Sequence, residues 1–159
     1  MDIFPDNFFD FVLFGFNGID HVHHNDRLRI LEEIKRVCKD GSIFCFSAHN
    51  ILSVKKLFSF PIYKDIISTL KGTVKFILFR ILNERYGKIV QRKYALVSEC
   101  GRWFRLRVYY INPDFQIRQL NENGFSNVRV FSLEDGNEIV NGLSAREDFW
   151  LYYLCNVNK

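Results

Sequence analysis

The chain has 159 residues, of which 48% are hydrophobic and 25% charged, a composition typical of a folded globular domain and not of a disordered protein. No apolar run approaches the roughly 20 residues that cross a bilayer, and the acidic amino terminus lacks the features of a signal peptide. The four cysteines form no CxxC pair. We therefore expect them to be reduced and the protein to be cytoplasmic.

The net charge of +4 is unevenly distributed along the chain. Residues 51–94 contain ten Lys or Arg against two acidic residues, so the remainder of the chain is mildly acidic. This pattern indicates either an inserted subregion with its own task or a solvated surface.

The first fifty residues predict a strand, a helix and a second strand. Residues 10–16 are continuously apolar, which is typical of a strand buried on both faces of a parallel sheet. Asn25 or Asp26 can cap the following helix, and Gly41 is expected to end it. Residues 42–48 form another short apolar run. The sequence therefore predicts a right-handed βαβ crossover.

The middle of the chain predicts an insertion into this fold. Residues 51–88 have a helical pattern with breaks at Pro61 and Gly72, and residues 93–111 predict a β-hairpin whose turn is Glu99-Cys100-Gly101-Arg102. We therefore expect one domain over residues 1–159 with basic helices and a hairpin inserted at 51–111.

The last third predicts a helix and two strands. Asn112 can be the helix cap and Pro113 the first helical residue, and Gly124 is expected to end the helix. Residues 127–133 and 149–157 then predict strands.

Three stretches of the sequence are similar to one protein family. They are FPDNFFDFVLFGFNGIDHV, LEEIKRVCKDGSIFCFSAHN and QLNENGFSNVRVF. In this order and approximate spacing they resemble the carboxyl-terminal half of class I S-adenosylmethionine-dependent methyltransferases. The resemblance implies a Rossmann-like α/β fold with a mostly parallel sheet, in which residues 149–157 form an antiparallel last strand, and residues 51–111 occupy the place of a substrate lid.

One element of that family does not occur in this sequence. There is no Gly-rich strand-to-helix turn of the GxGxG kind to cradle S-adenosylmethionine, and no later acidic residue to bind its ribose. In the resemblance, the strand at 10–16 also lacks its neighbour. We therefore expect a fragment of a longer protein, a chain that pairs with a separate amino-terminal half, or a homodimer joined through that edge. The isolated chain is expected to bind the cofactor weakly and to be inactive.

The resemblance also implies roles for single residues. Phe16, Asn17 and Gly18 would border the cofactor at the end of the first strand, and His21 would face the acceptor as a general base. His49, Asn50, Tyr109 and Tyr110 would line the substrate site. Each has a structural alternative: Asn17-Gly18 and His49-Asn50 can be turn residues, and one of the two tyrosines can lie in the core.

Residues His21, His23 and His24 raise the question of a metal site. Their spacing matches no known zinc motif, and no cysteine lies nearby. We therefore expect no metal and interpret them as polar loop residues.

Two other functions remain open beside a methyltransferase acting on an unidentified acceptor. One is a non-catalytic, methyltransferase-derived interaction module or partner subunit. The other is a basic surface-binding domain, in which RWFRLRVYY could bind nucleic acid or TVKFILFRIL could rest on an anionic membrane. From the sequence alone we do not expect a nucleic-acid or membrane partner.

Overall fold

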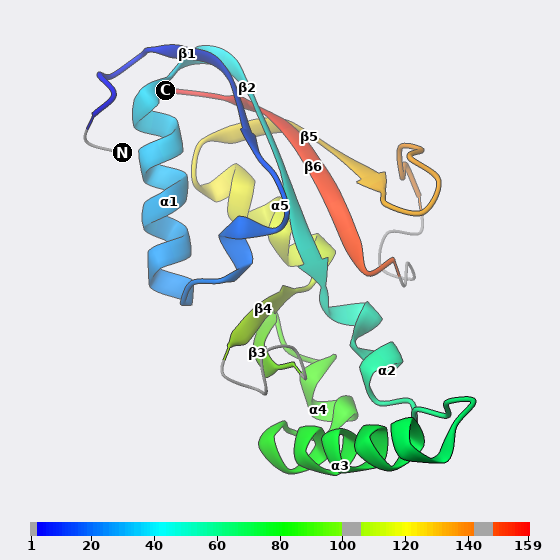
Figure 1. The fold of residues 1–159 in the computed structure, drawn as a ribbon. Coiled ribbons are helices and arrows are strands. Elements are labelled where there is room, and N and C mark those ends of the chain that lie inside the picture. Colours follow the sequence, from blue (N-terminus) through cyan, green and yellow to red (C-terminus); the bar gives the residue numbers. More distant parts are fainter. Residues whose placement is uncertain (1–2, 100–105, 142–147) are drawn as a thin grey trace.

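The structure, a computed structural model, describes residues 3–99, 106–141 and 148–159 (Figure 1). Its elements in chain order are β1 (Phe9–Phe14), η1 (Gly18–Asp20), α1 (His24–Val37), β2 (Cys38–Asn50), η2 (Ile51–Ser53), α2 (Val54–Leu57), α3 (Ile66–Leu82), α4 (Tyr86–Ile89), β3 (Tyr94–Ser98), β4 (Arg107–Ile111), α5 (Pro113–Glu122), β5 (Phe125–Ser132) and β6 (Trp150–Val157).

The six strands form one mixed sheet around β2. Their order is β3-β4-β2-β6-β5, and β1 pairs with β2 beside that path. The pairings of β2 with β1 and β4 are parallel, whereas β3–β4, β2–β6 and β5–β6 are antiparallel. The α/β class is confirmed, but a mostly parallel sheet was not the right description. The hairpin β3–β4 and the inserted strand β6 account for the difference, because both run against their neighbours.

The antiparallel last strand was expected from the resemblance and is confirmed. β6 lies between β2 and β5 and pairs with both. The helix before β5 also begins as predicted, since Pro113 is its first residue and the Asn112 carboxamide oxygen accepts a hydrogen bond from the backbone N–H of Phe115. Gly124, just after α5, has a φ of +85°, the left-handed conformation that follows many helices.

The junction between α1 and β2 differs from the prediction. The helix ends at Val37, and the strand begins at Cys38 without a turn. Gly41 lies inside β2 with a φ of +74°, where the register with β1 shifts between Phe9 and Phe11. Gly41 therefore allows a bulge in the strand.

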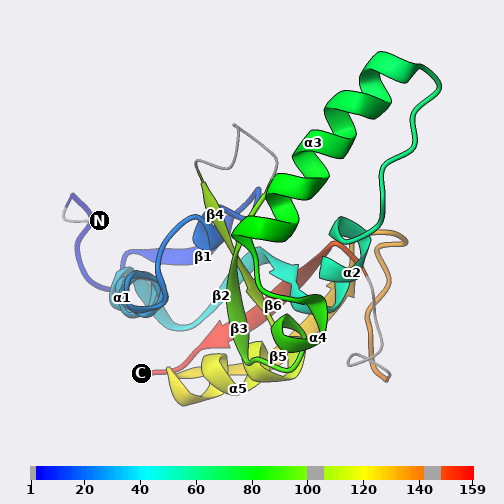
Figure 2. The ribbon, with the colours of Figure 1, turned by 90° about the horizontal axis from the view of Figure 1, so that it is seen from below.

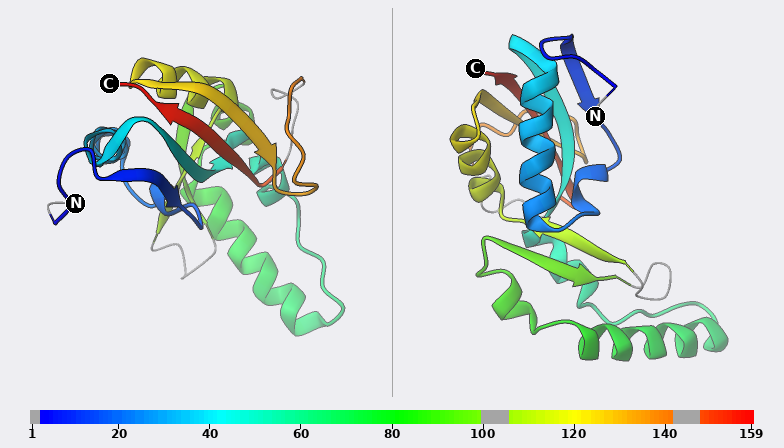
Figure 3. Two further views of the ribbon diagram at one scale, coloured as in Figure 1. Left: turned by 90° about the horizontal axis from the view of Figure 1, so that it is seen from above. Right: turned by 90° about the vertical axis from the view of Figure 1, so that its left-hand side faces the viewer.

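One face of the sheet is covered by helices. Both α1 and α5 lie on this face (Figure 3), and the main hydrophobic core lies beneath them. Fully buried side chains from both layers meet there, among them Leu31 and Ile34 of α1, Leu120 of α5 and Phe44 and Phe46 of β2.

The opposite face of the sheet is not covered by a helix of the described residues beside β1 and the middle of β2, and we call this part the open face. Directly paired residues share a face, and the register places the following on it: Phe11, Leu13, Ile43, Cys45 and Leu154. Phe11 is 52% exposed and Leu13 60%. The expectation of a strand at 10–16 buried on both faces was wrong, because no helix of the described residues covers this side.

The insertion at 51–111 extends from the carboxyl end of β2 (Figure 2). Its hairpin is confirmed as β3 and β4, whereas Cys100, Gly101 and Arg102 of the predicted turn lie outside the described residues. Gly72 does not interrupt a helix as predicted, since α3 runs through it. No helix among the described residues has the length and apolar character needed to cross a membrane.

Candidate functional site

The carboxyl ends of β1, β2 and β4 lie at the same end of the sheet because these strands run parallel. The chain leaves β1 through Phe16 and Asn17, both of which have a positive φ, 54° and 52°. That conformation is strained for a bulky side chain such as phenylalanine. It leaves the Phe16 side chain 92% exposed and buries Asn17. The turn then continues into η1, which ends at Asp20.

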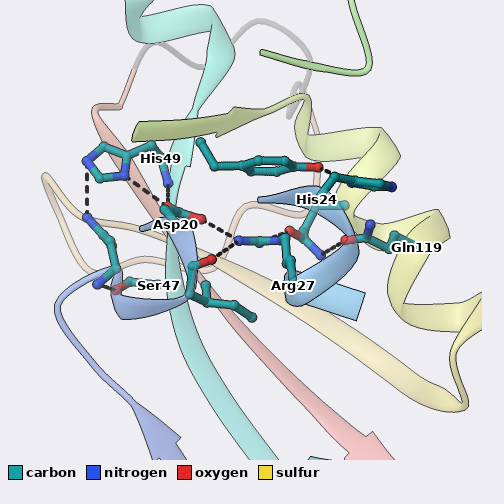
Figure 4. A network of polar contacts seen from close by, with 10 residues as sticks. Asp20, His24, Arg27, Ser47, His49 and Gln119 are labelled. Atoms are coloured by element: carbon teal, nitrogen blue, oxygen red, sulfur yellow. Dashed lines mark hydrogen bonds and ion pairs between the residues drawn. The ribbon is translucent and has the colours of Figure 1, made fainter. Parts of the chain in front are cut away.

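Asp20 is completely buried and forms an ion pair with Arg27 of α1, which is also completely buried (Figure 4). The Arg27 guanidinium also donates to the carbonyl oxygen of Ile19 at 3.0 Å and to Gln116 Oε1 at 2.5 Å. A buried ion pair needs such additional hydrogen bonds to offset the cost of desolvation. The pair therefore fixes the loop after β1 to both helices of the covered face.

The second oxygen of Asp20 holds His49 at the end of β2. Asp20 Oδ2 accepts hydrogen bonds from the backbone N–H of His49 at 2.6 Å and from its ring Nδ1 at 2.9 Å. Because Nδ1 carries the donated proton, the neutral ring presents Nε2 as a proton acceptor. The ring is packed beside Tyr110, Phe149 and Trp150.

Asn17 lies against the outer side of this histidine. Its Nδ2 is 3.5 Å from His49 Nε2, and its backbone N–H donates to Ser47 Oγ at 2.9 Å. Its carboxamide Oδ1 is buried and has no hydrogen-bond partner among the described residues. Buried polar atoms are rarely left unpaired, so this oxygen is a candidate contact for a bound ligand.

The other residues predicted to line the substrate site, Asn50, Tyr109 and Tyr110, have different surroundings in the structure. Asn50 caps η2, since its Oδ1 accepts from the backbone N–H of Leu52 at 3.0 Å. Tyr110 is buried beside His49 and donates from its hydroxyl to Glu99 at 2.5 Å. Tyr109 belongs to the core, where its ring centroid lies 4.8 Å from Cζ of the Arg27 guanidinium. Burial raises the pKa of both tyrosine hydroxyls, so both stay protonated.

The three neighbouring histidines do not converge. His21 and His23 border a hollow of about 400 Å³ with Leu96, Leu106 and Arg107. His24 instead stacks on Tyr94 with ring centroids 4.3 Å apart, and its Nδ1 lies 2.7 Å from the Tyr109 hydroxyl. Desolvation and the nearby Arg27 lower the pKa of His24. Within residues 3–99, 106–141 and 148–159, no three His, Cys, Asp or Glu side chains are grouped to hold a metal ion.

The structure therefore joins Asn17 and His49 in one cluster with Asp20, and places His21 at a separate hollow. Asp20 and Arg27 were missed by sequence analysis. A carboxylate directly before three histidines, in a turn between a strand and a helix, resembles an exposed loop residue. The sequence offered one signal, the apolar Ile19 between the turn glycine Gly18 and Asp20. The structure shows that Ile19 is buried, and Asp20 is buried with it.

Residues 1–46 match a family model described as a methyltransferase domain. Among solved structures, an S-adenosylmethionine-dependent methyltransferase from Methanosarcina mazei is similar with a TM-score of 0.54 and 16% identity, over 98% of this chain and 62% of that one. A Burkholderia thailandensis 1,6-didemethyltoxoflavin-N1-methyltransferase with bound S-adenosylhomocysteine has a TM-score of 0.51 and 10% identity, over 97% and 46%. A glycopeptide N-methyltransferase complexed with sinefungin has a TM-score of 0.51 and 16% identity, over 96% and 58%.

No curated protein sequence matches the chain. The chain spans less than two thirds of the length of each of the three structures. The expected resemblance to S-adenosylmethionine-dependent methyltransferases is therefore supported by the methyltransferase-domain match at residues 1–46, and the solved methyltransferases share the fold of this chain.

Proposed function

We propose that this chain forms the carboxyl-terminal portion of an S-adenosylmethionine-dependent methyltransferase, which transfers a methyl group to an acceptor when it is complete. The observation that carries the proposal is the buried cluster of Asn17, Asp20 and His49 at the carboxyl ends of parallel strands. Ligands of open α/β sheets bind at this end. The methyltransferase domain match at residues 1–46 supports the same conclusion.

Residues after β1 fit one side of a cofactor site. The buried Oδ1 of Asn17 has no hydrogen-bond partner among the described residues, so a donor of the ligand would satisfy it, and the exposed Phe16 ring can cover an apolar part of the ligand. Gly18 is half-buried beside them. When bound, S-adenosylmethionine supplies a methyl group activated by its sulfonium charge. We assign Phe16, Asn17 and Gly18 to border it, and the Gly-rich part of the cradle does not occur in this sequence.

The residues on the acceptor side hold and move a proton. His49 Nε2 takes the proton from an acceptor hydroxyl or amine as that atom attacks, while Asp20 fixes the tautomer through Nδ1. Tyr110 flanks this histidine, with its ring centroid 5.0 Å from that of His49, whereas Tyr109 lies in the core and Asn50 caps η2. His21, at the separate hollow, is the second candidate base.

The open face is proposed to bind the missing amino-terminal half. Phe11 and Leu13 are exposed there, and β1 pairs with no strand of the described residues other than β2. In a Rossmann-like sheet both faces are covered by helices. A further strand beside β1, with its helix over the open face, would complete both the sheet and the cofactor site. Pairing of two copies through β1 is the alternative.

Calorimetric titration with S-adenosylhomocysteine tests the proposal. The titrated proteins are this chain and the same chain extended by, or mixed with, the product encoded directly upstream of the Met1 codon. We expect micromolar binding only with the added half, and loss of at least tenfold in affinity for Asn17→Ala. Equally tight binding by the chain alone contradicts the half-site proposal. Absence of binding by both favours the non-catalytic interaction module.

A matched pair of variants in the complete enzyme identifies the base. His49→Asn keeps a donor toward Asp20 but removes the proton acceptor, so we expect kcat to fall about 100-fold or more with unchanged S-adenosylhomocysteine affinity. His21→Asn is expected to lower kcat less than about threefold. The reverse order would make His21 the base and His49 a structural residue.

A further inference from the structure

The outer face of α3 is an exposed apolar surface. Ile66 is 86% exposed, Leu70 65% and Ile81 72%. Together with Ile67, Val74, Ile77 and Leu78 they follow spacings of one, three or four residues, which places these seven side chains on one side of the helix. We call this surface the α3 apolar face; it consists of Ile66, Ile67, Leu70, Val74, Ile77, Leu78 and Ile81.

The inner face of α3 is already packed against the protein. A side chain on Gly72 would lie 2.5 Å from the Tyr63 ring, so the loop before α3 sits directly on the helix there. Phe79 is 2% exposed in the second hydrophobic core, where it contacts the Phe58 ring. These contacts fix which side of α3 faces outward. The apolar face is therefore not the side by which the helix folds onto the protein.

Positive charge flanks the α3 apolar face. Lys71 and Lys75 follow one border of it along the helix, and Arg80 lies on the other border, over the Phe58 and Phe76 rings. No acidic residue occurs between Ile66 and Leu82. Asp65 precedes the helix and is used as its cap, accepting from the backbone N–H of Ser68 at 2.7 Å. An apolar stripe bordered by cations is the pattern of helices that lie in a membrane interface.

The position of α3 exposes this face to a flat surface. In two perpendicular views α3 lies at one extreme of the molecule, with all other described elements on its inner side (Figures 1 and 3). A planar surface can therefore meet the helix along its whole length without contacting the sheet or α1.

We propose that α3 is an interfacial helix that binds the surface of a membrane containing anionic lipids. The apolar side chains enter the boundary between headgroups and acyl chains, and Lys71, Lys75 and Arg80 lie at the level of the phosphates. A second copy fits this face less well, because pairing two α3 helices would bring their flanking cations together with no acidic residue of α3 to balance them. The sequence TVKFILFRIL is compatible with a membrane surface, but its periodicity alone does not show which face of the helix is exposed, so no membrane partner was expected from it.

Co-sedimentation of the full chain with vesicles of phosphatidylcholine, with and without phosphatidylglycerol, tests the proposal. We expect binding to the anionic vesicles that weakens with salt. Ile66→Gln, Leu70→Gln and Ile81→Gln combined should lower the partition coefficient at least about tenfold. Lys71→Gln should lower it roughly fivefold for the one charge removed. All replaced side chains are exposed, so circular dichroism should be unchanged.

Two matched controls separate α3 from other surfaces. Phe11→Gln with Leu13→Gln changes the open face, and Arg29→Gln removes a cation from α1; both should leave vesicle binding within about twofold. The proposal is overturned if the chain does not bind anionic vesicles, or if the open-face variant abolishes binding while the α3 variant does not. It is equally overturned if the α3 substitutions only convert a dimer into a monomer in sedimentation velocity.

Discussion

At the scale of single residues, Asp20 is the residue on which the candidate site depends. One of its oxygens binds Arg27, and the other binds both the backbone and the ring of His49. Because Asp20 and Arg27 are completely buried, neither charge can be solvated if its partner is lost. The same carboxylate therefore stabilises the fold and sets the tautomer of the proposed base.

Replacing Asp20 by Asn should leave the Arg27 charge buried without a counterion. We expect the free energy of unfolding to fall by about 3–5 kcal/mol, measured by urea denaturation at pH 7. The double variant Asp20→Asn with Arg27→Met removes both charges and should lose less than the single variant. A single variant within about 1 kcal/mol of the wild type would show that the ion pair is not desolvated.

His24 should make the folded state sensitive to mild acid. Burial and Arg27 lower its pKa from the ordinary value of 6.5, so the unfolded chain binds more protons than the folded chain as the pH falls through 6.5. Stability is therefore fully present above pH 6.5 and declines below it. Urea midpoints measured from pH 7.5 to about pH 5.5 check this.

The matched variant for His24 is Phe, which keeps a ring to stack on Tyr94. Its midpoint should change less over the same pH range, although the contact with the Tyr109 hydroxyl is lost. An identical pH dependence in wild type and variant would assign the effect to another group. Carboxylates such as Glu33 and Glu138 have lowered pKa values and titrate below this range.

At the scale of elements, the bulge in β2 depends on Gly41. Its φ of +74° is unfavourable for any residue with a Cβ, although the space around it is open. Gly41→Ala should therefore cost about 1–2 kcal/mol of unfolding free energy, and Gly41→Asn less, because asparagine tolerates this conformation. Thermal unfolding of both variants measures the difference. Equal stability of Ala and Gly would mean that the bulge relaxes.

The same elements show what local sequence could predict. The start of α5 was predictable because Asn112 and Pro113 act on their own neighbours in the chain. The end of α1 was not, because Gly41 resembles a helix stop and only its pairing with β1 reveals a bulge. The cluster around Asp20 could not be predicted from local sequence either, because its contacts join residues that are far apart in the sequence, such as Arg27 and Gln116.

At the scale of the whole molecule, the two faces of the sheet are unequal. The covered face has a core of fully buried rings and aliphatic side chains, whereas the open face exposes Phe11, Leu13 and Ile43. The apolar run at 10–16 could not show whether helices of this chain cover one face of the strand or both. A strand that is apolar on both faces gives the same sequence pattern in either case. Exposed contiguous apolar surface of this kind marks an interaction site.

The open face should make the isolated chain self-associate when the proposed amino-terminal half is absent. We expect sedimentation velocity to show concentration-dependent association, because β1 offers both apolar side chains and an edge that pairs with no further strand of the described residues. Phe11→Lys with Leu13→Lys should suppress it by placing charge on the contact surface, and should also prevent binding of the proposed amino-terminal half. Val140→Lys, at an 80% exposed residue elsewhere, is the control and should leave association unchanged. If the double variant still associates, the contact between copies lies on another surface; if it still binds the proposed amino-terminal half, the open face is not where that half docks.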